Sequence, residues 1–250
     1  MISEPFATGN SIIHRIDPRF KIVFAVLLSV TVAVSQQFQT LGCAFLFSFI
    51  LLLVTHLNLI AVARRLVLVS GFLLLIWVIV PLTFEGDLLA RIGPFTIKRT
   101  GVVLAAQITL KSISILLLLM ALVTTMNFAM LGHALDRLHI PGKFVHLLLM
   151  TYRYLFVIDQ EYRRLVRAAK IRGFQPGTNI HTYKTYAYFI GMLFVRAAAR
   201  ADRVYRAMRC RGFKGNFYCL SDFLPHWRNW VFSGFMAIFF IGLALMEWIY

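Results

Sequence analysis

The stretch LVLVSGFLLLIWVIVPLTF, Leu66–Phe84, decides the fold class of this 250-residue chain. It carries no charge and approaches the roughly 20 apolar residues that cross a bilayer core of about 30 Å. Four further stretches are similar, with the bounds Phe20–Val34, Leu41–Ala63, Val102–Met126 and Trp230–Ile249. The sequence therefore predicts an all-α polytopic membrane protein with about five transmembrane helices.

The composition supports a membrane protein. Hydrophobic residues make up 60% of the chain and charged residues 14%, whereas soluble domains are about 45–50% apolar and about 25% charged. The first span also resembles a secretory signal, because basic residues precede an apolar run that ends in Ala-Val-Ser. We favour an uncleaved helix, since Asp17 suits the N-cap position and Pro18 the first helical position.

The positive charge is concentrated in one part of the chain. The formal net charge is +16, and 16 of the 26 lysines and arginines lie between Arg137 and Lys214. Cytoplasmic segments of membrane proteins carry such an excess, so we expect this segment to be cytoplasmic. Five spans then place the N-terminus and a turn at Arg64-Arg65 inside, and the Gln36–Thr40 turn, a Glu85–Arg99 loop or hairpin and the C-terminus outside.

These patterns suggest a division of the chain into three parts. Residues 1–126 hold the N-terminal transmembrane helices, residues 127–215 a cytoplasmic region, and residues 216–250 a C-terminal transmembrane helix. Lys111 is the one charged residue that we identify inside a span, where it either snorkels or packs toward a partner.

The basic region contains an internal repeat at an offset of 39 residues. AAKIRGF ends at Phe174 and AMRCRGF ends at Phe213, and apolar side chains recur at helical intervals before both. Gly173 and Gly212 follow the helical pattern, where glycine adopts the left-handed cap conformation without steric cost. Small residues would allow the two helices to cross closely. The matching pairs are Arg164/Arg203, Arg167/Arg206, Ala168/Ala207, Arg172/Arg211, Gly173/Gly212 and Phe174/Phe213.

Arg172 and Arg211 thus occupy the tips of two long helices. One alternative for a basic surface is general attraction to anionic lipid headgroups, and a single arginine at a helix end can simply complement the helix dipole. Two tips with the same ending favour a more specific role. A guanidinium matches a carboxylate with two hydrogen bonds, so the pair suits two equivalent acidic grooves on a dimeric partner.

Known catalytic and nucleotide-binding motifs are missing from the sequence. It has no phosphate-binding Gly-x-x-x-x-Gly-Lys-Ser/Thr loop and no HExxH or GxSxG motif. The spacing of His133, Asp136 and His139 does not place three metal ligands on one helix face. We therefore expect a non-catalytic chain with no cofactor, no catalytic residue and no metal site.

The sequence resembles the transmembrane T component of energy-coupling factor (ECF) transporters, the EcfT/CbiQ family. The resemblance covers most of the chain and rests on HRIDPRFK (His14–Lys21), GHALDRLHIPGKF (Gly132–Phe144), YRYLFVIDQEYRRL (Tyr152–Leu165) and RVYRAMRCRGFKG (Arg203–Gly215). The last two stretches are most similar to the cobalt-type CbiQ subgroup.

This resemblance implies a scaffold subunit of an ABC-type importer in the bacterial cytoplasmic (inner) membrane. In the family, two cytoplasmic coupling helices end in Ala-Arg-Gly signatures whose arginines dock into two ATPase subunits. The signatures correspond to Arg172-Gly173 and Arg211-Gly212, with Ile171 and Cys210 where the family usually has alanine. The implied partners are two CbiO-like ATPases, a CbiM-like substrate-binding S component with or without a small accessory membrane subunit, and membrane lipid.

The resemblance implies cobalt as the transported ion, with nickel as the alternative. A secondary transporter is a second alternative, but it should show an inverted repeat among its spans, and the repeat found here lies in the basic helices. A membrane-anchored nucleic-acid binder would not need paired Arg-Gly tips, so no nucleic acid is expected as a partner.

Overall fold

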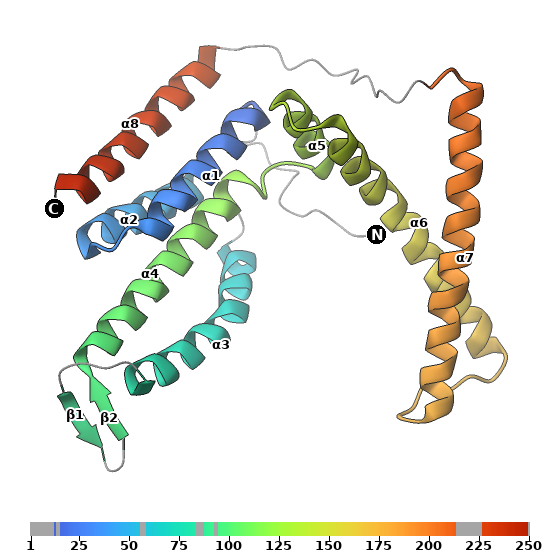
Figure 1. Ribbon diagram of the computed structural model, residues 1–250, viewed down its shortest axis with the longest axis horizontal. Coiled ribbons are helices and arrows are strands. Elements are labelled where there is room, and N and C mark those ends of the chain that lie inside the picture. The colour runs from blue at the N-terminus through green and yellow to red at the C-terminus, as the bar shows by residue number, and fades with distance from the viewer. Residues whose placement is uncertain are drawn as a thin grey trace. The chain divides into compact units, whose positions relative to one another are not determined.

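The computed structural model describes Ile13 and residues 16–55, 59–83, 88–92, 95–213 and 227–249. The all-α fold is confirmed, with a short antiparallel β-hairpin within the predicted Glu85–Arg99 segment (Figure 1). The elements are α1 Pro18–Val34, α2 Phe38–Val54, α3 Leu59–Thr83, β1 Leu88–Ile92, β2 Phe95–Lys98, α4 Arg99–Leu122, α5 Phe128–Arg137, α6 Gly142–Ile171, α7 Ile180–Cys210 and α8 Trp227–Ile249.

The chain forms two compact units. One, here called the membrane unit, comprises Glu4–Ala134 and Phe223–Tyr250. The other, here called the helix-pair unit, comprises Met1–Ser3 and Leu135–Asp222 and contains α6 and α7.

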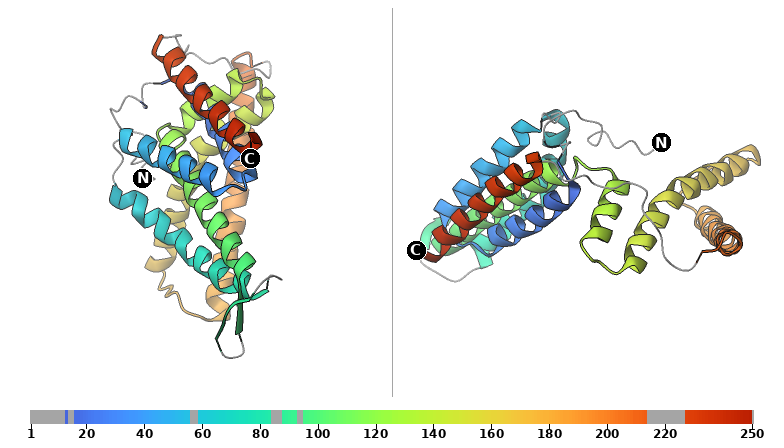
Figure 2. Two further views of the ribbon diagram at one scale, coloured as in Figure 1. Left: turned by 90° about the vertical axis from the view of Figure 1, so that its left-hand side faces the viewer. Right: turned by 90° about the horizontal axis from the view of Figure 1, so that it is seen from above.

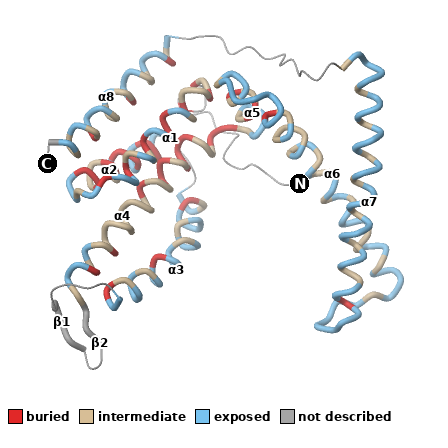
Figure 3. The backbone as a smooth tube through the Cα atoms, in the orientation of Figure 1, coloured by how far each residue is buried: buried red, intermediate tan, exposed pale blue. Residues whose placement is uncertain are grey.

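Helix α4 is central in the membrane unit. It packs against α1, α2 and α3, while α8 packs against α1 and α2 (Figures 1 and 2). Apolar side chains of four helices form the main core, where the buried positions of Figure 3 gather. Its members include Phe24, Leu28 and Val32 of α1, Leu41, Phe47 and Leu51 of α2, Leu118, Ala121 and Leu122 of α4, and Met236 and Leu243 of α8.

The start of α1 agrees with the prediction from sequence. Asp17 is the N-cap residue, and its carboxylate accepts a hydrogen bond of 3.1 Å from the backbone N–H of Arg19. Pro18 occupies the first helical position, where a missing N–H costs nothing.

Helix α8 lies parallel to α1 and is held at both ends. At one end the N–H of Asp17 donates to Oδ1 of Asn229, 3.3 Å away. At the other end Glu247 accepts hydrogen bonds from the Ser35 hydroxyl at 2.6 Å and from the N–H of Gln36 at 2.8 Å. The N-terminal ends of α1 and α8 thus contact each other, and so do their C-terminal ends. The two helices therefore begin on the same side of the membrane unit.

Helix α4 contacts the end of α1 and the turn that leads from α1 to α2. The Lys111 ammonium donates to the carbonyl oxygen of Ala33 at 3.0 Å, and the Gln107 amide donates to that of Gln36 at 2.6 Å. A cation is favourable at the C-terminal end of a helix, where carbonyl oxygens lack partners. Lys111 is therefore packed within the membrane unit.

Lys111 is not the only charged residue inside a predicted span, and that part of the sequence analysis was wrong. Lys21 lies in α1 and is 1% exposed, and Glu247 lies near the end of α8. Both sit close to a helix terminus with polar partners nearby, which is why the membrane unit tolerates them.

Among the described residues, three helices are long and apolar enough to cross a membrane: α3, α4 and Trp227–Trp248 of α8. Helix α2 is apolar but shorter, and α1, like α2, has 17 residues.

The predicted Leu41–Ala63 span and the turn at Arg64-Arg65 were wrong. Helix α2 ends at Val54 and α3 begins at Leu59, so both arginines lie inside α3. Thr55, His56 and Asn58 at the break are polar, but apolar residues lie on both sides of them, so the average hydrophobicity of the stretch does not reveal the break. Long arginine side chains are also tolerated near a membrane surface, where they extend to water.

Candidate functional site

The helix-pair unit is built from two helices of nearly equal length. Helix α6 has 30 residues and α7 has 31, and the offset of 39 maps residues 142–171 onto 181–210. The two helices are therefore equivalent in length as well as in the sequence of their basic ends. The helices run antiparallel and cross (Figure 1), and most of their residues are exposed (Figure 3).

Both helices end in the same backbone motif. Helix α6 ends at Ile171 with Arg172 as its C-cap, and α7 ends at Cys210 with Arg211 as its C-cap. The next residues are Gly173 with φ 83° and Gly212 with φ 79°. The predicted left-handed glycines are thereby confirmed.

The hydrogen bonds at the two ends are equivalent. The N–H groups of Gly173 and Phe174 donate to the carbonyl oxygens of Lys170 and Ala169, each at 3.0 Å. At the other end, Gly212 donates to Arg209 at 3.0 Å, and Phe213 donates to Met208 at 3.1 Å. This is the Schellman arrangement, which satisfies carbonyl groups that a helix end otherwise leaves without partners.

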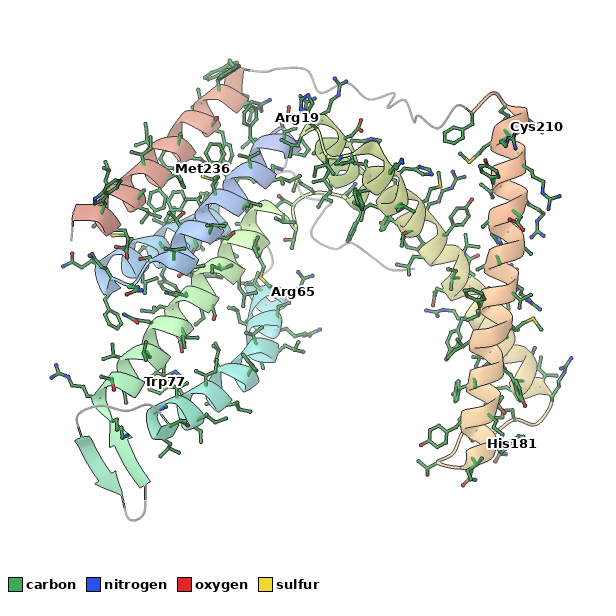
Figure 4. The ribbon with its side chains drawn as sticks, viewed as in Figure 1. Arg19, Arg65, Trp77, His181, Cys210 and Met236 are labelled. Carbon is green, nitrogen blue, oxygen red and sulfur yellow. The ribbon has the colours of Figure 1, made fainter. Side chains whose placement is uncertain are left out.

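The side chains that precede the glycines point outward. Arg172 and Arg211 are exposed, and so are Ile171, at 87% of its surface, and Cys210. Figure 4 labels Cys210 at the end of α7. At each tip an exposed arginine follows an exposed residue that differs between the two copies, so a partner that binds the arginine also meets Ile171 or Cys210.

The phenylalanine after each glycine folds back onto the other helix. The Phe174 ring lies 6.0 Å from the ring of Tyr186 and 6.2 Å from that of Phe189, both edge-on, and 6.3 Å from His181. The Phe213 ring lies 6.4 Å from His146 near the start of α6. From the sequence, the two phenylalanines are visible only as a matching pair of the repeat, because their anchoring contacts depend on the antiparallel pairing of α6 and α7.

His146 sits in the apolar environment that this packing creates. Partial burial lowers the pKa of its imidazole below the usual value.

The antiparallel pairing separates the two tips. Each tip phenylalanine contacts the first turns of the other helix, so Arg172 and Arg211 lie at opposite ends of the pair. A helix of 30 residues is about 45 Å long. The tips can therefore reach two separate binding sites at once.

An ion pair joins the two helices near their crossing. Glu161 of α6 pairs with Arg196 of α7 and lies 3.6 Å from Arg164 on its own helix. Small side chains of α7 face α6 there, but they leave a cavity of about 340 Å³ between the helices. Apolar residues line most of this cavity, including Met150, Leu155, Ile158, Leu193 and Ala197.

The comparison with protein families addresses the identity of the chain. A family model described as cobalt transport protein, CbiQ, matches residues 9–219, which include both tips. This chain belongs to the CbiQ family.

Several similar proteins have names that fit membership of the CbiQ family. The chain is 28% identical over 229 residues to the energy-coupling factor transporter transmembrane protein EcfT of Macrococcus caseolyticus, covering 86% of each chain. It is 26% identical to EcfT of Bacillus subtilis, covering 86% of this chain and 85% of that protein. EcfT of Listeria innocua is 27% identical, with 91% and 90% covered. This CbiQ-family protein is thus the transmembrane T component of an ECF transporter.

Proposed function

We propose that this T component links two ATPase subunits to a substrate-binding membrane subunit, with Arg172 and Arg211 as the two docking residues. The observation that carries the proposal is the pair of equivalent helix ends, each with an exposed arginine held between a helix and a left-handed glycine. The ATPases hydrolyse ATP, and this chain transmits their motion without catalysis.

The chemistry of the tips suits acidic grooves. A guanidinium presents a planar fork of N–H donors that forms two parallel hydrogen bonds with one carboxylate. The glycine that follows adds no side chain beside the fork, and the Schellman bonds fix the direction in which the helix ends. A partner with two equal subunits would offer one such groove to each tip.

The helix pair is suited to transmitting motion. Phe174 and Phe213 tie each tip to the other helix, and the Glu161–Arg196 pair joins the helices near their crossing. When ATP binding brings the two ATPases together, the tips are drawn toward each other and the crossing changes. Such a device needs two arrangements that the nucleotide state favours differently.

We further propose cobalt as the transported ion, with nickel as the alternative. The description of the family model supports cobalt, whereas the ligands of the ion would belong to the S component. Uptake of radioactive cobalt and nickel by cells that express the complete transporter distinguishes the two. Uptake that continues without ATP hydrolysis would instead indicate a secondary transporter.

Co-purification of the ATPases with charge-reversed variants tests the docking proposal. Arg172→Glu and Arg211→Glu should each weaken the complex by about 2–5 kcal/mol, because a buried charge pair is lost and its acidic partner remains. Arg167→Glu and Arg206→Glu are matched controls, since they occupy equivalent exposed positions of the repeat. These controls should cost about 0–1 kcal/mol, as exposed ion pairs do. Equal losses in all four variants would contradict docking through the tips and would indicate general attraction to anionic lipid.

A further inference from the structure

The membrane unit contains a second basic site. A groove of about 550 Å³ runs between the first turns of α3 and the last turns of α4. Arg64 and Arg65 lie at it, and Figure 4 labels Arg65 near the end of α3 opposite to the end that carries Trp77. The other lining residues are Leu68, Val69, Leu116, Leu119, Met120, Val123 and Thr124.

The length of α3 places the two arginines at the level of lipid headgroups. From Leu66 to Thr83 the helix continues for 18 residues, which span about 27 Å at a rise of 1.5 Å per residue. This length is close to the thickness of a hydrocarbon core, about 30 Å. Leu68 is 84% exposed, as expected of a side chain that faces acyl chains.

The lining favours a lipid over water or a free ion. Water molecules in this groove would find few hydrogen-bond partners, because most of the residues that line it are apolar. In the part of the chain that the structure describes, no acidic residue lines the groove. Two guanidinium groups at one end of an apolar groove match a phosphate group joined to an alkyl chain.

We propose that this groove binds an anionic phospholipid, with its phosphate at Arg64 and Arg65 and one acyl chain between α3 and α4. The acyl chain would fill the space between α3 and α4 where these two helices do not contact each other directly. This proposal concerns the membrane unit alone and does not depend on docking through Arg172 and Arg211.

Native mass spectrometry of the full-length chain in detergent tests the proposal, with dioleoyl phosphatidylglycerol and dioleoyl phosphatidylcholine as probes. Each arginine near anionic headgroups contributes about fivefold in affinity, so phosphatidylglycerol should bind about 30-fold more tightly. The double variant Arg64→Gln/Arg65→Gln should lose this preference. The matched control Arg167→Gln/Arg206→Gln removes the same charge outside the groove and should keep it. An equal loss in the control, or equal binding of both lipids by the unaltered chain, would overturn the proposal.

Two further measurements separate a lipid from a free phosphate. Val69→Phe fills part of the groove without changing its charge, so it should weaken phosphatidylglycerol binding while the charge of the chain stays the same. Inorganic phosphate in large excess should not displace the lipid, because it lacks the acyl chain. Displacement by phosphate, or unchanged binding by Val69→Phe, would show that the arginines bind an anion without the groove. ATPase co-purification with these variants should stay at its normal level, which distinguishes this result from a failure of the tips.

Discussion

Replacement of Phe174 by alanine should loosen the tip of α6 while leaving Arg172 in place. The ring is half-buried and makes edge-on contacts with Tyr186 and Phe189. Such aromatic contacts contribute about 0.5–1.5 kcal/mol each beyond the area they bury. We therefore expect local opening of the tip to become easier by about 2 kcal/mol, which corresponds to about 30-fold.

Hydrogen–deuterium exchange measures this opening directly. The N–H of Gly173 donates to Lys170, and the N–H of Gly177 donates to the Thr182 hydroxyl at 3.2 Å, so both report on the tip. Their exchange should accelerate by about 30-fold in Phe174→Ala. Phe144→Ala is the control, since Phe144 is 66% exposed on the same helix and its loss should leave the tip unchanged.

The affinity of the Phe174→Ala variant for the ATPase should fall by at most about 30-fold, because only molecules with an ordered tip can dock. Phe174→Tyr keeps the ring and should restore both exchange and docking. Exchange in Phe174→Ala equal to that of the Phe144→Ala control would refute the anchoring role. Faster exchange with undiminished ATPase affinity would refute the idea that a fixed tip is needed for docking.

Three other predictions concern topology and packing. In a background without native cysteines, Gly177→Cys should label from the cytoplasm and Arg99→Cys from outside, and labelling of both from one side would contradict the orientation. Gly101→Ala should destabilise the chain by about 1–3 kcal/mol in thermal unfolding, because the added Cβ would lie 2.6 Å from Cα of Pro81. Gly42→Ala is the control, since a Cβ at Gly42 meets open space and should leave thermal unfolding unchanged. Glu247→Ala should lower the melting temperature, because two donors lose a charged acceptor, and an unchanged melting temperature would show that this contact is not stabilising.

The apolar stretches and the glycine-terminated repeat could be predicted from sequence because both depend on local information. An uncharged run such as Leu66–Phe84 indicates a helix wherever it lies in the fold, and Gly173 must end a helix because other residues avoid its conformation. The break after Val54 was missed because neither proline nor glycine marks it and because apolar residues resume directly after the polar Thr55, His56 and Asn58.

Contacts between distant parts of the chain could not be predicted. Glu247 is one acid in an apolar terminal helix, and only the parallel packing of α8 on α1 gives it Ser35 and Gln36 as donors. Phe174 likewise gains its partners from the antiparallel course of α7. A single sequence records neither arrangement, because both depend on which helices become neighbours.

The parallel pairing of α1 and α8 has a consequence for biogenesis. Ribosomes make proteins from the N-terminus, and the acceptor for Ser35 and Gln36 is Glu247, which is translated 211 residues after Gln36. Until then the first two helices reside in the bilayer with one wall of their core open, because Met236 and Leu243 are still missing. A chain that stops before α8 therefore exposes this wall to quality-control proteases, and the core of the membrane unit closes only after α8 has been made.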